Sequence, residues 1–498
     1  MNRAASDTLA WRLTGVARDS RTQIDDLTNK RGYLAGALRW RPDDATTIDV
    51  IVSHTADSPI SPPGVPYALT QAADGKRLRD LYAGEPGWDD SDRKMTNVGV
   101  EISHEFAGGW TLQQGFRAEK FDWDYTGHYV SGLTADGAAI TRGANYQLED
   151  TQGLSADTRL AGEVTTGAAV HKLLFGLDIR HYKADTTTRF LRSADLDWRN
   201  PGYGTAPGEA WYIAENDLTL RQVGIYAQDE IEAGPWRGSV ALRHDRTRQW
   251  GDAGNNFAGI SWQDQSDSAT TGRLGLGYQM ANGVMPYVSY STSFEPEIGV
   301  DHAGNTLKPT RGKQWELGVK YAPDSFDGLI TASVYDLRQT DVTRRVTIDG
   351  VPGNYQIGEV KSRGVELEAT ASLASNWALR ASYAWNETEQ LGGANDGKEM
   401  PNAPQHLASL WLDHDFGNGV SAGGGLRHIG SRFGDLANVY DLGSVTLLDA
   451  AVRYETDRWD ASLNISNLTD EVYVANCGSF GCYYGEGRTL NAKVAARW

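Results

Sequence analysis

The chain alternates apolar and polar residues along most of its length, and the pattern is clearest in its last segment, GRTLNAKVAARW (487–498). The apolar residues of one parity are Leu490, Ala492, Val494, Ala496 and Trp498. The other parity carries Thr489, Asn491, Lys493 and Arg497. Successive side chains of a strand point to opposite faces, so this segment has one apolar and one polar face. It predicts a terminal strand that closes a transmembrane β-barrel, or alternatively an edge strand of a soluble all-β domain.

The same alternation recurs in segments throughout the chain. The connections between these segments are alternately short and long. Short turns are expected at 107–109, 233–235 and 281–284, and long segments at 126–145, 187–215 and 251–267. One short-turn side and one long-loop side are typical of an up-and-down antiparallel barrel. We expect an all-β transmembrane barrel of about 20 strands, many long enough to cross a bilayer when tilted. A soluble β-propeller is the alternative fold.

Composition narrows the class of protein. No segment approaches 18 consecutive apolar residues and the mean hydropathy is -0.48, which excludes a helical membrane protein but not a barrel. The formal net charge is -18, so we expect no nucleic-acid partner. The 56 Gly, 22 Tyr and 16 Trp residues suit many turns and an aromatic girdle, but they also suit a soluble propeller or lectin.

Two local features bear on the compartment. The two cysteines, Cys477 and Cys482, lie in the segment CGSFGC, which predicts a small disulfide in an oxidising compartment. No further ligands accompany them, so we expect no metal site. The first residues, MNRAASDTLAW, contain no apolar segment of a signal peptide, and we expect none in this chain.

Several strings in order along the chain resemble the barrel of TonB-dependent siderophore receptors, nearest those of the ferrichrome or hydroxamate type. They are WRLTGVARDS (11–20), LRWRPDDAT (38–46), GIYAQDE (224–230), PYVSYSTSFEPEIG (286–299), KPTRGKQWELGVKYAP (308–323), VKSRGVELEA (360–369), NLTDEVYVANC (467–477) and GCYYGEGRTLNAKVAARW (481–498). The resemblance implies a bacterial outer-membrane receptor and transporter for a ferric siderophore, and not an enzyme. The family usually ends on Phe, whereas this chain ends on Trp498.

The resemblance also implies parts that we do not find. Family members carry a plug domain and a barrel of about 22 strands, and the string at 11–20 belongs to their third strand. We therefore divide the chain into a short N-terminal remnant, residues 1–8, and a receptor barrel, residues 9–498, with the plug and first hairpin missing. We expect the TonB system to act only if a plug is supplied. A porin-like channel without a plug and an inactive truncated receptor are the alternatives.

Aromatic side chains are the candidate ligand contacts. Phe121, Trp123 and Tyr125 share the parity of polar residues such as Gln113 and Arg117, which places them inside the lumen near a long loop. Further candidates are Tyr483 and Tyr484 after the cysteines, and four residues in the long loop 187–215: Trp198, Tyr203, Trp211 and Tyr212. Packing between loops is the alternative role for all of them. The expected ligand is a ferric siderophore of hydroxamate type, and the expected surroundings are outer-membrane lipid.

No pattern of catalytic residues is visible. The ten histidines are scattered, without an HExxH motif or a cysteine–histidine metal pattern, and GxSxG is absent. We therefore expect no enzyme and no cofactor, and the iron of a siderophore would arrive inside its chelate.

Overall fold

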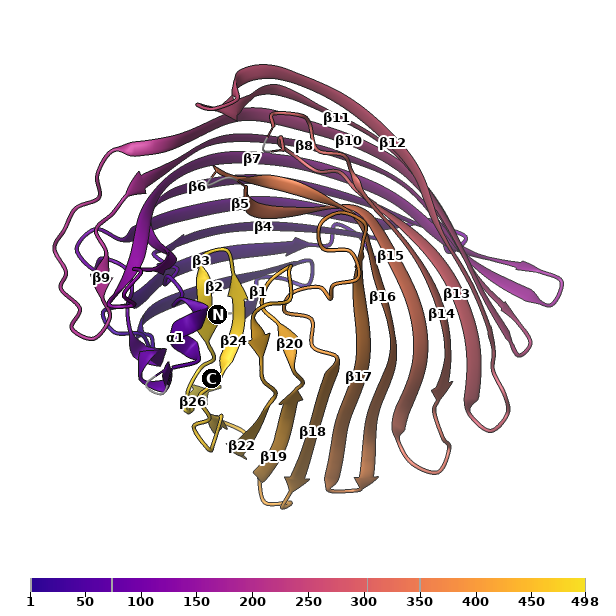
Figure 1. Cartoon of the computed structure of the whole chain (residues 1–498). Coiled ribbons are helices and arrows are strands. Elements are labelled where there is room, and N and C mark those ends of the chain that lie inside the picture. The colour runs from indigo at the N-terminus through magenta and orange to yellow at the C-terminus, as the bar shows by residue number, and fades with distance from the viewer. Residues whose placement is uncertain (1, 73–74, 302, 349–350, 498) are drawn as a thin grey trace.

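The chain forms one large, strongly curved antiparallel β-sheet (Figure 1). The computed structural model describes residues 2–72, 75–301, 303–348 and 351–497. Within these residues the sheet has 22 strands, of which β1 (Asn2–Ala4) and β9 (Leu196–Asp197) are short additions. The main strands are β2 (Leu9–Arg21), β3 (Thr28–Trp40), β4 (Thr46–Asp57), β5 (Asp90–Glu105), β6 (Thr111–Leu133), β7 (Ala139–Thr166), β8 (Ala169–Arg192), β10 (Ala210–Ala233), β11 (Trp236–Asn255), β12 (Gly259–Tyr278), β13 (Val284–Glu295), β14 (Thr310–Tyr321), β15 (Gly328–Ile348), β16 (Val351–Ala374), β17 (Trp377–Leu391), β18 (His406–Asp415), β19 (Val420–Ile429), β22 (Val445–Glu455), β23 (Trp459–Ser466) and β26 (Thr489–Ala496).

Each main strand pairs with the next one along the chain, as in an up-and-down barrel. The predicted fold class is therefore confirmed, and the main strands match the predicted number of about 20. No helix among the described residues is long and apolar enough to cross a membrane.

The two faces of the sheet differ as the alternation predicts. On β14, Trp315 and Leu317 are each 58% exposed, although both are large and apolar. Glu316, on the opposite face, accepts a hydrogen bond of 2.5 Å from the Tyr287 hydroxyl. Tyr125, on that same polar face, contacts Ser61 in the segment that folds into the concave side of the sheet (Figure 1). The apolar face is therefore the convex outer one, where lipid can cover it.

The strands are longer than the alternation alone predicts. Residues 126–145 were expected to form a long loop, but β6 runs to Leu133 and β7 begins at Ala139, with pairing such as Thr126↔Tyr146. The expected loop at 251–267 likewise becomes the hairpin of β11 and β12, which turns at 256–258. Paired backbone groups satisfy each other there, so strands continue well beyond the length that crosses a bilayer.

The longest irregular connection, residues 58–89, carries the helix α1 (Tyr67–Thr70) and the 3₁₀ helix η1 (Gly75–Asp80). Two small hairpins lie in other long connections. They consist of β20 (Arg432–Phe433) with β21 (Asp441–Leu442), and of β24 (Val474–Gly478) with β25 (Gly481–Tyr484).

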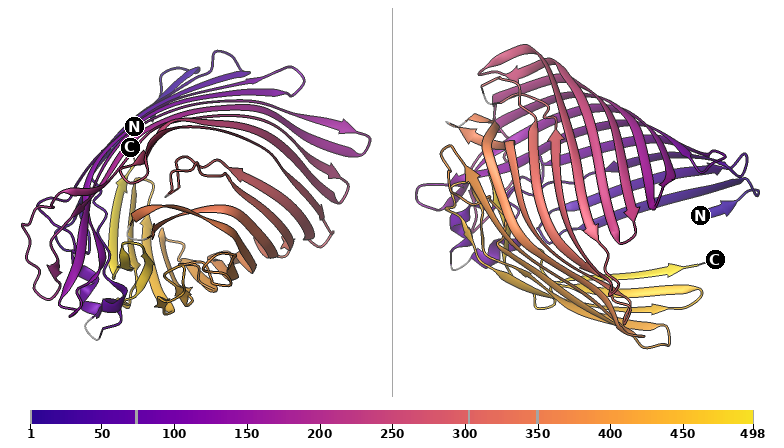
Figure 2. Two further views of the ribbon diagram at one scale, coloured as in Figure 1. Left: turned by 45° about the horizontal axis from the view of Figure 1, so that its top comes forward. Right: turned by 90° about the vertical axis from the view of Figure 1, so that its right-hand side faces the viewer.

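The two edges of the sheet lie near one another (Figures 1 and 2). At one edge β1 pairs with residues 10–12 of β2, and at the other β26 pairs with β23. Among the described residues, no pairing joins β26 to β1 or β2. Of the predicted closing signal, Leu490, Ala492, Val494 and Ala496 lie in β26, and Trp498 lies outside the described residues. The structure therefore presents a barrel wall with a seam beside its terminal strand.

Candidate functional site

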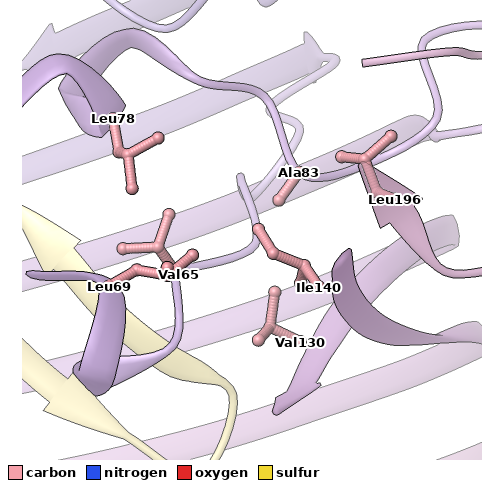
Figure 3. Close-up of a cluster of buried hydrophobic side chains, with 7 residues drawn as sticks. All are labelled: Val65, Leu69, Leu78, Ala83, Val130, Ile140 and Leu196. Atoms are coloured by element: carbon pink, nitrogen blue, oxygen red, sulfur yellow. The ribbon is translucent and has the colours of Figure 1, made fainter. Parts of the chain in front are cut away.

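A cap at the long-loop end of the barrel is built around a small hydrophobic core (Figure 3). Segment 58–89 brings apolar side chains against Val130 of β6, Ile140 of β7 and Leu196 of β9, and Ile140 is fully buried. The apolar residues that segment 58–89 contributes are Val65, Leu69, Leu78 and Ala83. Because α1 and η1 are too short to be stable alone, this shared burial holds the segment in place.

The hairpin of β24 and β25 joins the same cap. Its two strands are linked next to the turn by a disulfide between Cys477 and Cys482, with an S–S distance of 1.95 Å. The amide of Val65 donates to the carbonyl of Cys482 at 2.8 Å, and the amide of Cys482 donates back at 2.7 Å. The cysteines therefore anchor segment 58–89 to a connection some 400 residues away in sequence.

Asp89 centres a buried polar network beneath the cap. Its carboxylate accepts from the Tyr82 hydroxyl and from the amide of Glu85 at 2.9 Å. It also lies 2.6 Å from Nδ1 of His128, whose Nε2 lies 2.9 Å from Oγ of Ser193. Burial, and then the charge of Asp89, raise the pKa of Tyr82 well above its usual range, so its phenol stays a donor.

A second buried contact ties the same segment to β7. The Arg142 guanidinium donates to the carbonyl oxygens of Gly84 at 2.6 Å and Ala194 at 3.0 Å, and lies 3.7 Å from the Glu85 carboxylate. Glu85 in turn accepts from the amide of Gly204 at 2.5 Å. The connections 58–89 and 193–209 are thus held to each other and to β7 by charged groups whose partners are all within the cap.

The order Ser193, His128 and Asp89 matches that of a hydrolytic triad, and sequence reasoning did not bring these residues together. The His128 side chain is 0% exposed, and both of its ring nitrogens are already engaged. A general base must be within reach of the substrate, so this arrangement is a structural link. Within the described ranges, no three His, Cys, Asp or Glu side chains gather as metal ligands.

The three lumenal aromatics predicted on β6 lie on its polar face, and Tyr125 contacts the cap. Nε1 of Trp123 donates to Oγ of Ser91 at 3.0 Å, and the Trp123 and Tyr125 ring centroids are 5.2 Å apart. Tyr125 is buried and its hydroxyl donates to the Ser61 carbonyl at 3.4 Å. Phe121 is half-buried. Segment 58–89 therefore covers part of the surface that was predicted to receive a ligand.

The other predicted aromatics also take part in the cap. Trp198 packs on its hydrophobic core and donates to the Gly137 carbonyl at 3.0 Å, while the Tyr203 hydroxyl donates to the Tyr82 carbonyl at 2.8 Å. Tyr484 packs against the same core, and burial raises its pKa to about 12. Burial also raises the pKa of Tyr483. Ligand contact by these residues stays a prediction.

A second aromatic group lies beside the cap. Of its members, only Trp211 and Tyr212 were among the aromatic residues that the sequence singled out. We call it the aromatic cluster. Its members are Tyr129, Phe190, Trp211, Tyr212, Phe257 and Phe480. Phe480, at the tip of the disulfide hairpin, has its ring centroid 5.2 Å from that of Tyr129. Phe257, at the turn between β11 and β12, is 59% exposed and stacks on Tyr212 at 6.1 Å.

A cavity of about 330 Å³, the mouth cavity, adjoins this cluster through Tyr212. Its polar lining includes Glu149, Thr188, Asn216, Asn255 and Asp301. Two carboxylates and no Lys or Arg occur among its lining residues within the described chain. Aromatic side chains beside a polar wall that carries two carboxyl groups suit a bulky ligand that is neutral or cationic.

The fold, with its apolar outer face, charged inner face and capped mouth, is that of an outer-membrane β-barrel of the receptor type. A family model described as "TonB dependent receptor-like, beta-barrel" matches residues 32–468. The chain belongs to the TonB-dependent receptor family.

Two curated relatives and one solved structure illustrate the similarity. The chain is 32% identical to the ferrioxamine B receptor of Salmonella typhimurium, covering 98% of this chain and 71% of that protein. It is 30% identical to the ferrichrome outer membrane transporter/phage receptor of Escherichia coli K12, covering 98% of this chain and 70% of that protein. The ferric-catecholate import receptor Fiu of E. coli K12 superposes with a TM-score of 0.84 at 19% identity, covering 99% of this chain and 78% of that chain. These relatives are receptors and transporters, which agrees with the prediction that the chain is not an enzyme.

Proposed function

We propose that this protein binds a ferric siderophore of the hydroxamate type at the mouth of an outer-membrane barrel, and passes it into the lumen. The observation that carries the proposal is the mouth cavity with its aromatic rim. The predicted contacts Phe121, Trp123, Tyr125, Trp198, Tyr203, Tyr483 and Tyr484 form or line the neighbouring cap, and we propose that they border the ligand's path.

The charge of the mouth cavity supports hydroxamate over catecholate. Ferric iron bound by three singly charged hydroxamates is neutral, whereas iron bound by three doubly charged catecholates is strongly anionic. Glu149 and Asp301 would repel an anionic chelate in a partly desolvated cavity. The relatives at 30% identity or above that are named for ferrioxamine and ferrichrome point the same way.

We further propose that residues 9–498 act as the barrel portion of the receptor, with residues 1–8 as a short N-terminal remnant. Energised uptake through TonB would then require a plug domain within the lumen. The match of a barrel model over residues 32–468 supports a receptor barrel in that part of the chain, and the boundary at residue 9 stays a prediction. That the chain lacks a plug stays a prediction.

Ligand titration of the purified protein tests the proposed specificity. We expect ferrioxamine B to quench tryptophan fluorescence with saturation, and a ferric tris-catecholate of similar size to bind at least about tenfold more weakly. Phe480→Ala should weaken ferrioxamine B binding by about tenfold, because it removes the ring that bridges Tyr129 and Phe190.

Phe416→Ala is the matched control, because Phe416 is an exposed aromatic at the short-turn end of β18. It should leave binding unchanged. Equal affinity for both chelates, or an unchanged affinity in the Phe480→Ala variant, would contradict the proposed site. In planar bilayers, a steady open conductance insensitive to ligand would favour the porin-like channel instead.

A further inference from the structure

Glu149 of β7 belongs to a row of inner-face side chains that crosses the wall of the mouth cavity. Glu149 is directly opposite Thr186 of β8, which is itself opposite Asn216 of β10. All three residues line the mouth cavity, so their side chains share the inward parity. On the other side of Glu149, Trp123 of β6 is directly opposite it. The strand register therefore places one carboxylate between an indole ring and two neutral polar side chains.

The Glu149 carboxylate has no cationic partner in this row. The side-chain nitrogen of Gln147 donates to its Oε2 at 3.4 Å, which is longer than an ordinary hydrogen bond. Among the residues that the structure describes, no Lys, Arg or His forms an ion pair with Glu149. Nearer the short turns of the same inner wall, by contrast, Asp178 lies 2.6 Å from Nη2 of Arg243. An opposite charge stabilises an ionised group, so Glu149 is a position where a ligand can supply that charge.

Asp301, the other carboxylate of the mouth cavity, is engaged by its own loop. It accepts from the amides of Ala303 at 2.9 Å and Asn305 at 2.8 Å, and from the Asn305 side chain at 3.1 Å. Its charge adds to the negative potential of the cavity, but much of its hydrogen-bonding capacity is used. Glu149 is therefore the carboxylate that a ligand can engage directly.

The side chains beside Glu149 suit a protonated amine. The Asn216 side-chain nitrogen donates to Oγ1 of Thr186 at 3.1 Å, which leaves the side-chain oxygen of Asn216 as an acceptor. Tyr182, four residues before Thr186 on β8, adds an aromatic ring to the cavity wall. A carboxylate, an amide oxygen and an aromatic ring all attract an ammonium group, which carries a positive charge and three N–H donors.

Glu149 also lies within reach of a chelate that contacts the aromatic cluster. Tyr212 of that cluster and Asn216 are four residues apart on β10, and both line the mouth cavity. At ~3.3 Å per residue, their Cα atoms are about 13 Å apart. A ferric trihydroxamate with a short alkyl arm spans such a distance. The compact chelate can thus contact the rings while the end of its arm meets Glu149.

We propose that Glu149 is a specificity-determining residue, which selects hydroxamate chelates that carry a protonated amine on a flexible arm. The ammonium group donates to the Glu149 carboxylate, with Tyr182 and Asn216 beside it. Such charge-assisted hydrogen bonds are strong in a partly desolvated cavity, so a single charge on the ligand changes its affinity. This assignment rests on the proposed hydroxamate site, and it adds the part of the ligand, remote from the iron, that the site distinguishes.

Two probes that differ by this one charge test the assignment. Ferrioxamine B ends in a primary amine, and acetylation of that amine removes the charge without altering the three hydroxamates. In tryptophan-fluorescence titrations of the protein purified from outer membranes, we expect ferrioxamine B to bind about tenfold more tightly than its N-acetyl derivative. Glu149→Gln should lower the affinity for ferrioxamine B to that of the acetyl derivative, and should leave the affinity for the acetyl derivative unchanged.

Glu215→Gln is the matched control. Glu215 precedes Asn216 on β10, is exposed and pairs with Thr187, so its side chain lies on the opposite face of the wall from Glu149. The variant removes the same charge without altering the cavity, and it should retain the preference for ferrioxamine B. Binding of the acetyl derivative and heat-modifiable migration verify that each variant is folded.

Three results would overturn the role of Glu149: equal affinity of the unaltered protein for both chelates, an unchanged preference in the Glu149→Gln variant, or loss of the preference in the Glu215→Gln variant. The last result would mean that net charge, and not contact with Glu149, decides the preference. Binding of neither chelate by the unaltered protein would overturn the proposed hydroxamate site and this assignment with it. Equal binding of both would leave that site intact and remove only the role of Glu149, so the two failures are distinguishable.

Discussion

Asp89 shows how a single side chain can hold several distant segments together. It accepts from Tyr82 and the Glu85 amide, and it orients His128, which reaches Ser193 on the far side. All of these groups except Ser193 are almost completely buried. Burying a carboxylate costs free energy unless hydrogen-bond donors compensate it. The buried donors in turn lose their acceptor if the carboxylate is removed.

Asp89→Ala is therefore expected to loosen the cap. Removing the carboxylate leaves the Tyr82 hydroxyl and His128 Nδ1 without their acceptor, at a cost of about 1–3 kcal/mol for each unsatisfied group. Hydrogen exchange of segment 58–89 should accelerate by about tenfold or more. Asp92→Ala is the control, because Asp92 is exposed and bonds only Lys94 among the described residues. Equal exchange in both variants would show that the Asp89 network does not hold the cap.

Among individual residues, the candidate site was only partly predictable from sequence. Parity correctly places Trp123 and Tyr125 on the lumenal face of β6. It cannot show that segment 58–89 contacts Tyr125, nor that Phe480 meets Tyr129 from a connection some 350 residues away. These contacts depend on which loops fold together, and no local pattern encodes that.

At the scale of elements, each strand must suit the bilayer on one face and the lumen on the other. An outward position needs an apolar side chain, whereas an inward position faces a polar lumen. A charged substitution should therefore lower the free energy of unfolding on the outward face and be tolerated on the inward face. Short turns and alternating segments were predictable because they depend on neighbours in sequence. The extensions of β6 to Leu133 and of β7 back to Ala139 were not predictable, because apolar and polar residues do not alternate regularly in them.

Leu317→Arg tests the orientation of β14. Leu317 lies in the middle of the strand and is 58% exposed on the apolar face, so a buried cation there should cost about 2–4 kcal/mol in a bilayer. Gln314→Arg, on the lumenal face beside Glu316, should be tolerated. Urea titration of both variants in lipid vesicles measures the difference in free energy of unfolding. Equal destabilisation would contradict the assignment of the two faces.

At the scale of the whole molecule, the seam is the notable feature of the barrel. Among the residues that the structure describes, β26 is paired on one side only, and β1 covers only residues 10–12 at the free edge of β2. Unpaired backbone groups each cost several kcal/mol in hydrocarbon, because no water is present to bind them. Two such edges side by side require either further pairing or a partner strand.

We accordingly expect the 498-residue chain by itself to insert inefficiently into vesicles. The measurement is the heat-modifiable, protease-resistant fraction after refolding, compared with that of the E. coli ferrichrome transporter. A fully resistant barrel formed by this chain alone would show that the edges pair with each other in lipid. The intact mass of the protein in native outer membranes would show whether it occurs there at 54.4 kDa or within a longer chain.

The sequence by itself determined the barrel class, the approximate number of strands, the two faces of each strand and the family resemblance. These follow from a two-residue period and from short strings, which are local properties of the chain. The tertiary structure alone decided which loops form the cap and which aromatic side chains adjoin the mouth cavity. Those features arise from strand register and loop packing between residues far apart in sequence. Such contacts form only when the strands are paired in the correct register, which no local pattern specifies.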